Sequence, residues 1–471
     1  MAGVENFNPR QKSLALITMI VAVVLEIVDM TIVNTALPAI KADFGAGSEA
    51  AQWIVAGYSL SFALLLLTGG RLGDSYGYRR MFLLGVSGFT LASLACGLAG
   101  TANELVAARL LQGATGAIMA PQFMALMQVL FEPLERVSKL ALFGLIGGLA
   151  SIIGPILGGL LIEADLFGLG WRLVFLINLP VGLMAVISGW HFLPETRSSH
   201  PAGFDVSGTV LFGLALLGLL WPLTRVDAGW GWREWTCLAL ALPFALAGWR
   251  HVAGRVATRR PALFDPSLFN ILPFRIGLYI SIAFAAANAG FLLSFAFALQ
   301  AERGETPLMT GLLHMPFGFG AMIGIAVLGR NFLPRFGKWV LASGGLVMAA
   351  SALAVLAGIG KLDLGWPQLV PLLVVAGMGM GALSGCIAPV TVAQVERDHA
   401  GAASGLLKTA QQVGAALGIA VTGSIYFAWS GTAGTPPSLA AALVVVALLV
   451  LCSALAARLP RAIFAPRPAQ G

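Results

Sequence analysis

Charged residues are scarce in this chain. Only 10% of its 471 residues are Asp, Glu, Lys or Arg, whereas 58% are hydrophobic and the mean hydropathy is +0.88. A soluble protein of this length carries far more surface charge, so the composition indicates a polytopic membrane protein. The net charge of +7 therefore does not indicate nucleic-acid binding, and we expect no nucleic-acid partner.

Several motifs that indicate other functions are also missing. No Gly-rich phosphate loop ending in Lys-Ser or Lys-Thr is present, so the chain does not itself hydrolyse ATP. No loop is long enough for a soluble domain, and no convergent nucleophile or metal cluster indicates an enzyme. The cysteines lie in apolar runs without the spacing of metal ligands, and we interpret them as packing residues. They are Cys96, Cys237, Cys386 and Cys452.

Long apolar runs are abundant instead. We count fourteen, each long enough to cross a bilayer as a helix, which takes about 20 residues. They cover residues 14–38, 50–69, 81–100, 104–130, 140–162, 173–193, 206–224, 235–250, 272–299, 308–329, 339–360, 367–392, 402–429 and 437–458. Lys and Arg gather in alternate loops, and the positive-inside rule then places both termini in the cytoplasm, as an even helix count requires.

A weak internal repeat divides the chain. GRLGDSYGYRR at 70–80 follows the second run, and GRNFLPRFGKW at 329–339 follows the tenth. Each copy follows the second run of a group of six, so we expect two six-helix bundles with two inserted helices, unless the likeness is chance. Duplicated halves are typical of transporters. The expected parts are an N-terminal bundle at 14–193, a linker with the inserted helices at 194–260, a C-terminal bundle at 261–458 and a tail at 459–471.

The first run carries two acids, Glu26 and Asp29, inside an apolar segment. They are three residues apart and therefore share one helix face. A charged acid near the middle of a spanning helix costs roughly 3 kcal/mol or more, so a helix that only crosses the membrane would not keep two. They are candidates for proton or cation handling; alternatively, one of them pairs with a basic residue and only holds helices together.

Arg109 lies inside the fourth run, in LVAARLLQGATGA at 105–117. An arginine in the hydrocarbon region must face a partner or water. It lies near the expected height of Asp29, so a pair with Asp29 or Glu26 is within reach and would link protonation to helix position. Snorkelling toward the outer helix end is the alternative. Gln112 lies one helical step along and is assigned to the same site.

The connection at 70–80 concentrates charge and glycine. Glycine allows backbones to approach closely, and a carboxylate can accept hydrogen bonds from arginine or from helix N-termini. We interpret this segment as a gating loop that latches helix ends in one state, with a simple positive-inside anchor as the alternative. The residues concerned are Gly70, Arg71, Asp74, Gly77, Arg79 and Arg80.

The fifth run, ALFGLIGGLASIIGPILGG at 141–159, is rich in glycine. Pro155 removes one backbone hydrogen bond and bends the helix. Glycine faces let helices approach and slide. The segment predicts a hinge or close seam, and ordinary tight packing is the alternative.

Polar residues also occur in the second half. Lys408 and Gln412 are one turn apart in ASGLLKTAQQVGAALG at 403–418, and His314 lies in the tenth run. Together with Gln112 they are candidates for lining a substrate cavity. The alternatives are a snorkelling Lys408 and a His314 satisfied within the core.

These segments together resemble the major facilitator superfamily, and specifically its fourteen-helix drug:proton antiporters. The resemblance covers nearly the whole chain. It rests on DMTIVNTALP with Asp29, GRLGDSYGYRR, the Arg109–Gln112–Gly113 pattern, GWRLVFLINLP at 170–180, FDVSG at 204–208, ASGLLKTAQQVGAALG, and an antiporter-motif ending with Gly154, Pro155, Gly158 and Gly159. The chain departs from the pattern at Ala141, Ala150 and Lys408, and Glu26 is an additional acid.

The resemblance implies a major facilitator fold and secondary active export of small amphipathic compounds in exchange for protons. Asp29, Glu26 and Arg109 are then expected to couple proton flow to transport. It implies a multi-pass protein of the inner (cytoplasmic) membrane, monomeric, with no cofactor beyond the proton gradient and no metal. A proton-coupled metabolite symporter of the same fold is the alternative, against which the fifth run argues; a membrane-embedded enzyme is a third reading without supporting residues.

Overall fold

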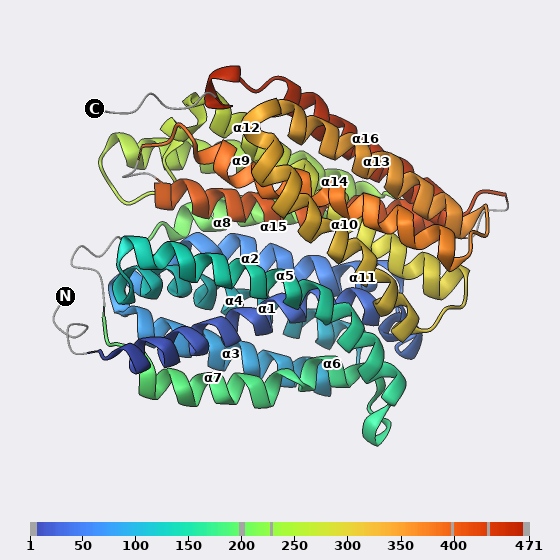
Figure 1. Ribbon diagram of the computed structural model, residues 1–471, viewed down its shortest axis with the longest axis horizontal. Coiled ribbons are helices and arrows are strands. Elements are labelled where there is room, and N and C mark those ends of the chain that lie inside the picture. The colour runs from blue at the N-terminus through green and yellow to red at the C-terminus, as the bar shows by residue number, and fades with distance from the viewer. Residues whose placement is uncertain (1–6, 197–202, 227–228, 397–399, 431–433, 465–471) are drawn as a thin grey trace. The chain divides into compact units, whose positions relative to one another are not determined.

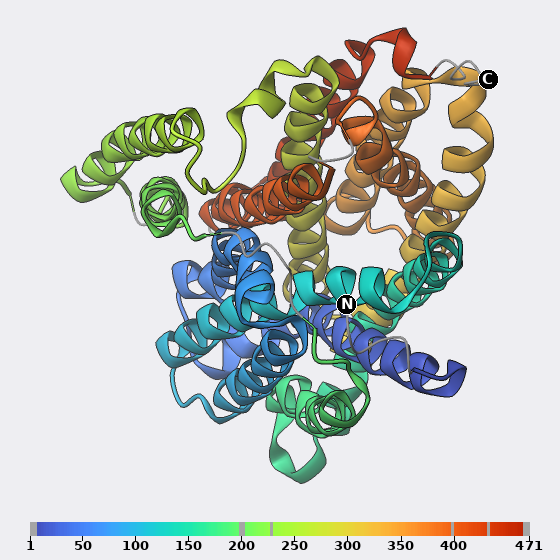
Figure 2. The same cartoon turned by 90° about the vertical axis from the view of Figure 1, so that its left-hand side faces the viewer.

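The computed structural model describes residues 7–196, 203–226, 229–396, 400–430 and 434–464. The regular structure of these residues is helical, and fourteen helical segments within them are long and apolar enough to cross a membrane. This confirms the all-α polytopic fold and the helix count expected from the sequence. The long helices of each unit run across Figure 1 from side to side, and Figure 2 looks along them.

Contacts divide the chain into two compact units. Unit 1 comprises Met1–Arg225, Gly229–Phe264 and Thr306–Leu312, and unit 2 comprises Val226–Ala228, Asp265–Glu305 and Leu313–Gly471. The two inserted helices thus belong to unit 1, whereas the domain limits expected at residues 193, 260 and 458 remain predictions.

The helices of unit 1 are mostly longer than the apolar runs that predicted them. They are α1 (Pro9–Asp43), α2 (Ser48–Tyr76), α3 (Tyr78–Leu98), α4 (Ala102–Leu130), α5 (Pro133–Ala164), α6 (Leu173–Leu176), α7 (Asn178–Phe192), α8 (Val206–Leu223) and α9 (Trp232–Ala257). The sixth span is not one regular helix, because a 3₁₀ turn at Gly170–Arg172 and α6 precede α7.

The helices from α10 onward belong to unit 2, except that the first residues of α11 belong to unit 1. They are α10 (Leu272–Phe297), α11 (Pro307–Ile323), α12 (Leu333–Phe336), α13 (Lys338–Gly360), α14 (Trp366–Val392), α15 (Ala400–Trp429) and α16 (Pro437–Ala457). Two π-helical segments extend them, η4 (Ala298–Glu302) after α10 and η5 (Gly324–Phe332) after α11.

Local sequence determines where α1 begins. The Asn8 side chain accepts a hydrogen bond from the Gln11 backbone (2.9 Å), and the Gln11 side chain accepts one from the Asn8 backbone (3.0 Å). This reciprocal capping satisfies two amides that the helix leaves without partners, and Pro9 occupies the first helical position, where proline loses nothing.

The loop expected at 70–80 is much shorter in the structure. α2 continues to Tyr76 and α3 starts at Tyr78, so Gly77 alone separates them, with a φ of 101° that favours glycine. Gly337 likewise separates α12 from α13, with a φ of 55°. Near the end of each copy of the repeat, therefore, a glycine in the left-handed region redirects the chain.

The core of unit 1 is packed between α1, α3, α4 and α7. Phe82, Met119 and Phe123 are among the buried side chains of one apolar cluster, which also includes Met19 of α1 and Ala185 of α7. Because lipid is as apolar as these side chains, they hold the helices together mainly through close van der Waals packing. These helices also supply the polar residues described next.

Candidate functional site: a buried polar network

An ion pair joins α1 and α4 inside unit 1. Arg109 Nη1 lies 2.6 Å from Asp29 Oδ2, and the side chains are 1% and 0% exposed. The sequence left Asp29 and Glu26 open as partners of Arg109, and the structure confirms a pair with Asp29. Both charges lose their hydration on burial. Their mutual attraction compensates for this loss only when further hydrogen bonds satisfy the remaining donors and acceptors.

Arg109 is held by several groups besides Asp29. Its Nε donates to the Ile54 carbonyl of α2 at 3.0 Å, and its Nη1 also donates to Gln112 Oε1 at 2.5 Å. The guanidinium carbon lies 4.4 Å from the centre of the Tyr58 ring, close enough for a cation–π interaction. Arg109 is therefore directed into the bundle and does not snorkel toward a helix end.

The other oxygen of Asp29 accepts two amide hydrogen bonds. Gln112 Nε2 and Asn178 Nδ2 both donate to Asp29 Oδ1 at 2.8 Å, and both also donate to Ser93 Oγ, at 2.8 and 3.3 Å. Only one orientation of the Gln112 amide fits, because its oxygen must face the Arg109 donor and its NH₂ group must face the Asp29 carboxylate. All these neighbours donate N–H bonds to Asp29, so the arrangement suits an ionised carboxylate.

The network connects five helices of unit 1. Asp29 belongs to α1, Ser93 to α3, Arg109 and Gln112 to α4, and Asn178 to α7, while α2 contributes the Ile54 carbonyl. The direct partners of Asp29 belong to α4 and α7, so a change in its charge alters contacts that join α1 to both helices.

Glycine in α4 allows this close packing. A Cβ on Gly113, next to Gln112, would collide with the Tyr58 carbonyl and the Ser61 hydroxyl of α2. Close approach here brings the Ile54 carbonyl within reach of Arg109. The short pattern Arg109–Gln112–Gly113 thus combines two polar network members with the residue that lets their helix approach α2.

Glu26 is also buried, at 4% exposure, one turn before Asp29. Both acids act electrostatically on the Tyr58 hydroxyl, which is itself buried. The two acids that the sequence placed on one helix face therefore both lie inside unit 1, with Asp29 in direct contact with Arg109.

The sequence analysis did not identify three members of this site. Asn178 lies in the INLP segment of 170–180, where an amide within an apolar run is a usable signal. Ser93 and Tyr58 give no comparable signal, because serine and tyrosine are common in spanning helices. Only their positions beside Asp29 and Arg109 distinguish them.

The glycines of the antiporter motif pack α5 against α1. A Cβ on Gly154 would collide with the Thr31 side chain, and one on Gly158 would lie 2.7 Å from Ile32 Cγ1. Pro155 lies inside the continuous helix α5. Also within unit 1, a Cβ on Gly159 would collide with the backbone of Pro307 and Leu308. α1 thus carries Asp29 toward the network while its other side contacts α5.

Arg71, in the segment expected to gate, contacts the chain on both sides of the inserted helices. Its guanidinium donates to the Gly203 carbonyl at 2.8 Å and to the Ala262 carbonyl. Asp74 of the same segment accepts a hydrogen bond from the Tyr78 hydroxyl at 2.9 Å. Arg71 therefore ties the end of α2 to the segments that precede α8 and follow α9.

The remaining basic residues of this segment differ in their surroundings. Arg79 pairs with Glu195 at 3.1 Å and donates to the Trp190 carbonyl of α7, whereas Arg80 is exposed. Gly70 packs near Pro121 of α4. The segment 70–80 thus contacts several parts of unit 1.

Asp205, in FDVSG, joins the inserted helices to each other. Its side chain accepts hydrogen bonds from the Gly208 amide (2.9 Å) and the Leu263 amide (3.0 Å), and His251 Nε2 of α9 lies 2.9 Å away. Burial opposes the ionisation of Asp205, but these hydrogen bonds outweigh it and hold its pKa below the ordinary value.

The cavity residues expected in the second half belong to unit 2. Gln412 and His314 are buried, at 3% and 5% exposure, and the His314 ring packs edge-on against Phe295 at 5.0 Å. Lys408, one turn before Gln412, is exposed. Gln112 belongs to the network of unit 1, and the assignment of these four residues to one substrate cavity remains a prediction.

The described part of the chain contains no group of three or more His, Cys, Asp or Glu side chains placed to hold a metal ion. In the polar network, Arg109 already pairs with the Asp29 carboxylate, which does not suit a metal ion there.

Comparison with known proteins identifies the family of the chain. Residues 19–419 match the family model of the Major Facilitator Superfamily. The chain is similar to the probable actinorhodin transporter of Streptomyces coelicolor, with 38% identity over 88% of this chain and 72% of the relative. It is similar to the tetracenomycin C resistance and export protein of Streptomyces glaucescens, with 34% identity over 87% and 74%.

A third relative is the multidrug efflux pump LfrA of Mycolicibacterium smegmatis, with 30% identity over 90% of this chain and 82% of the relative. Among solved structures, a bacterial homologue of the human lysosomal transporter Spinster, inward-facing and occupied, superimposes with a TM-score of 0.70. It covers 98% of this chain and 100% of its own at 17% identity, so it supports the fold alone.

Proposed function

The chain belongs to the Major Facilitator Superfamily, and we propose that it exports small amphipathic compounds in exchange for protons. Membership makes it a multi-pass transporter of the inner membrane and not an enzyme, and its relatives are drug and antibiotic exporters. The relatives named for actinorhodin transport and for tetracenomycin C export support an antibiotic-like small molecule as the substrate.

The observation that carries the proton coupling is the buried pair of Asp29 and Arg109, 0% and 1% exposed. Asp29 is the member that can change charge, because arginine keeps its proton at any working pH. Protonation of Asp29 removes the carboxylate that contacts the buried Arg109, and breaking a buried pair costs about 3–5 kcal/mol.

That energy is of the size needed to change conformation. Inverting a two-state equilibrium from 1:99 to 99:1 takes about 5.5 kcal/mol. The amides of Gln112 and Asn178 lose an ionised acceptor in the same step, and both sit on helices other than α1. We infer that proton binding shifts α1 relative to α3, α4 and α7 until Arg109 finds another partner or water.

Glu26 gives the same helix a second titratable group, one turn from Asp29. In the proposed cycle, substrate and proton compete for this acidic part of α1. The close contact of α5 with Thr31 and Ile32 then transmits the movement of α1 to α5. The segment 70–80, which contacts α4, α7 and both flanks of the inserted helices, acts as the latch.

Transport by inverted membrane vesicles tests this function. An imposed proton gradient should drive uptake of a fluorescent aromatic cation or an anthracycline-type dye, and an uncoupler should abolish it. Asp29→Asn should abolish gradient-driven transport yet preserve exchange of labelled for unlabelled dye without a gradient, because exchange needs no net proton movement.

Glu163→Gln is the matched control, because Glu163 is exposed at the end of α5. It should transport as the unmodified protein does. Gradient-driven transport that survives Asp29→Asn with unchanged pH dependence would refute the proton role of Asp29. Uptake in the direction of proton flow would support the symporter instead.

A further inference from the structure

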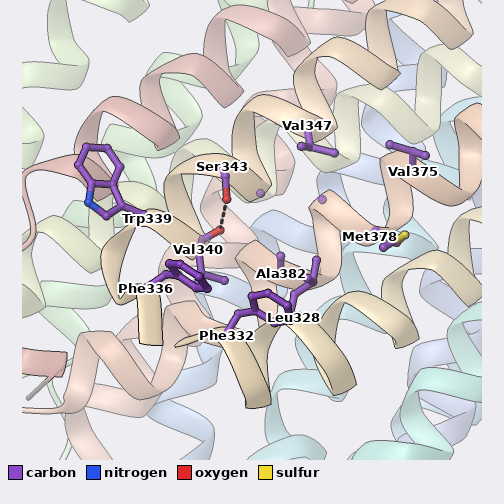
Figure 3. Close-up of a pocket in the computed structure, with 12 residues that line it drawn as sticks. Leu328, Phe332, Phe336, Trp339, Val340, Ser343, Val347, Val375, Met378 and Ala382 are labelled. Atoms are coloured by element: carbon purple, nitrogen blue, oxygen red, sulfur yellow. Dashed lines mark hydrogen bonds between the residues drawn. The ribbon is translucent and has the colours of Figure 1, made fainter. Parts of the chain in front are cut away.

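An apolar groove lies on unit 2, where η5, α12, α13 and α14 meet (Figure 3). Its volume is about 400 Å³, within the range of about 300–1,000 Å³ that is typical of small-molecule sites. Phe332, Val347 and Met378 are among the side chains that line it. Of its lining side chains, Ser343 carries a hydroxyl, and this donates to the Val340 carbonyl of its own helix at 3.3 Å.

Two glycines make the floor of the groove. A Cβ on Gly344 of α13 would lie 3.0 Å from both the Ala382 side chain and the Gly379 carbonyl, and one on Gly379 of α14 would lie 2.6 Å from the Met348 amide. The two helices therefore touch through their backbones here. Larger side chains stand on both sides of this contact, so the surface is hollow between them.

Among the residues that the structure describes, several side chains of the groove remain exposed. Phe332, Val347 and Val375 are 39%, 39% and 42% exposed, although they belong to or flank helices that span the membrane. For helices with this length and hydropathy, the expected surroundings of an exposed face are lipid hydrocarbon. An unfilled apolar hollow forfeits dispersion contacts, so an acyl chain is favoured to occupy it.

One end of the groove is aromatic and basic. Phe336 and Trp339 are both 55% exposed and lie on the same side of the groove, with the Trp339 ring apart from the other labelled side chains (Figure 3). Exposed tryptophan at a helix end is typical of the membrane–water interface. Arg335 is exposed, and residues 324–347, which form this wall, contain no acid.

Further cations lie beyond Arg335. Lys338 Nζ donates to the Ala457 carbonyl at 2.5 Å, which places the end of α16 beside the start of α13. Arg458 and Arg461, directly after that end, are exposed. Arg335 and Lys338 do not line the groove, but they adjoin its lining residues Phe336 and Trp339 in the sequence. Basic residues beside an apolar slot at the end of a spanning helix have the charge pattern that binds an anionic lipid headgroup.

We propose that this groove is a binding site for an anionic phospholipid of the surrounding bilayer. One acyl chain lies over Gly344 and Gly379, and the phosphate lies at Arg335 and Lys338. The site is separate from the Asp29 network and does not depend on the proposed proton coupling.

Native mass spectrometry of the purified full chain, titrated with phosphatidylglycerol or phosphatidylcholine of equal chain length, tests this proposal. Phosphatidylglycerol should bind more tightly. Val347→Trp fills the groove and should remove the tight site. Arg335→Gln should weaken phosphatidylglycerol about fivefold, the equivalent of about 1 kcal/mol for one basic residue at a membrane surface, and leave phosphatidylcholine unchanged.

Two matched controls separate the site from general effects. Leu346→Trp places the same indole at the neighbouring position of α13, which is 51% exposed and does not line the groove, and Arg250→Gln removes an exposed charge from unit 1. Both should bind phosphatidylglycerol as the unmodified chain does. Equal affinity for the two lipids, or tight binding that survives Val347→Trp, would overturn the proposal. So would a site that takes an amphipathic cation but no lipid.

Discussion

Replacing Asp29 and Arg109 singly and together measures how strongly the buried pair is coupled. Asp29→Asn leaves a buried guanidinium without a counter-charge, and Arg109→Gln leaves a buried carboxylate without one. Each single change should lower the free energy of unfolding by about 3–5 kcal/mol. The double variant is neutral at both positions, and its amides are able to bond to each other and to Gln112.

The magnitude follows from the geometry. The two side chains are 1% and 0% exposed and 2.6 Å apart, so water does not screen either charge in the single variants. The double variant should therefore be less destabilised than the sum of the single ones by about 2–3 kcal/mol, at the upper end of measured couplings between contacting residues.

Reversible unfolding in mixed micelles of lipid and denaturing detergent, followed by tryptophan fluorescence, measures each variant. The pair Arg303–Asp363 serves as control, because it has a similar length of 2.9 Å but Asp363 is 89% exposed. The same cycle should give about 0.2–1 kcal/mol there. If the cycle for Asp29 and Arg109 gives a coupling no larger than this control, the charges are already solvated in the folded chain, and the reasoning about their burial fails.

Three further outcomes are expected, each from a separate contact. Asn178→Ala removes one of the amide donors to Asp29 and should destabilise the chain by about 1–3 kcal/mol in the same unfolding assay; no loss would mean that this amide does not support the carboxylate. Gly154→Ala should cost about 1–3 kcal/mol through its collision with Thr31, whereas Gly148→Ala, with open space around its Cβ, should cost nothing, and equal effects would contradict the close packing of α1 and α5. Asp205→Asn should lower stability by about 1.5–3 kcal/mol at neutral pH. Because folding lowers the pKa of Asp205, its stabilisation is complete above the unfolded value of about 4 and is lost as pH falls through the lower folded value. The difference between variant and unmodified chain should therefore shrink below about pH 4 in a pH series of melting temperatures, and a constant difference would refute this account.

Much of the fold was predictable because a bilayer imposes simple constraints on sequence. A spanning helix must satisfy its own backbone and present about 20 apolar residues, so length and hydropathy identify each span. The fourteen predicted runs correspond to the fourteen spans of the structure. Their ends were less predictable, since Arg71 and Asp74 continue α2 in a helical conformation that their polarity did not suggest.

The sequence by itself determined that Asp29, Glu26 and Arg109 need special surroundings, because charge inside hydrocarbon is too costly to be incidental. Only the tertiary structure decided that Arg109 pairs with Asp29, and that Ser93 and Asn178 complete the site. The Asn178 amide within an apolar run signals a polar contact but not its partner, and the serine type of Ser93 gives no signal until the helices bring it beside Gln112 and Asn178. Depth in the membrane is a property of one helix and can be read along the chain, whereas hydrogen bonding between helices depends on their rotation and approach, which Gly113 and Gly154 permit but do not specify.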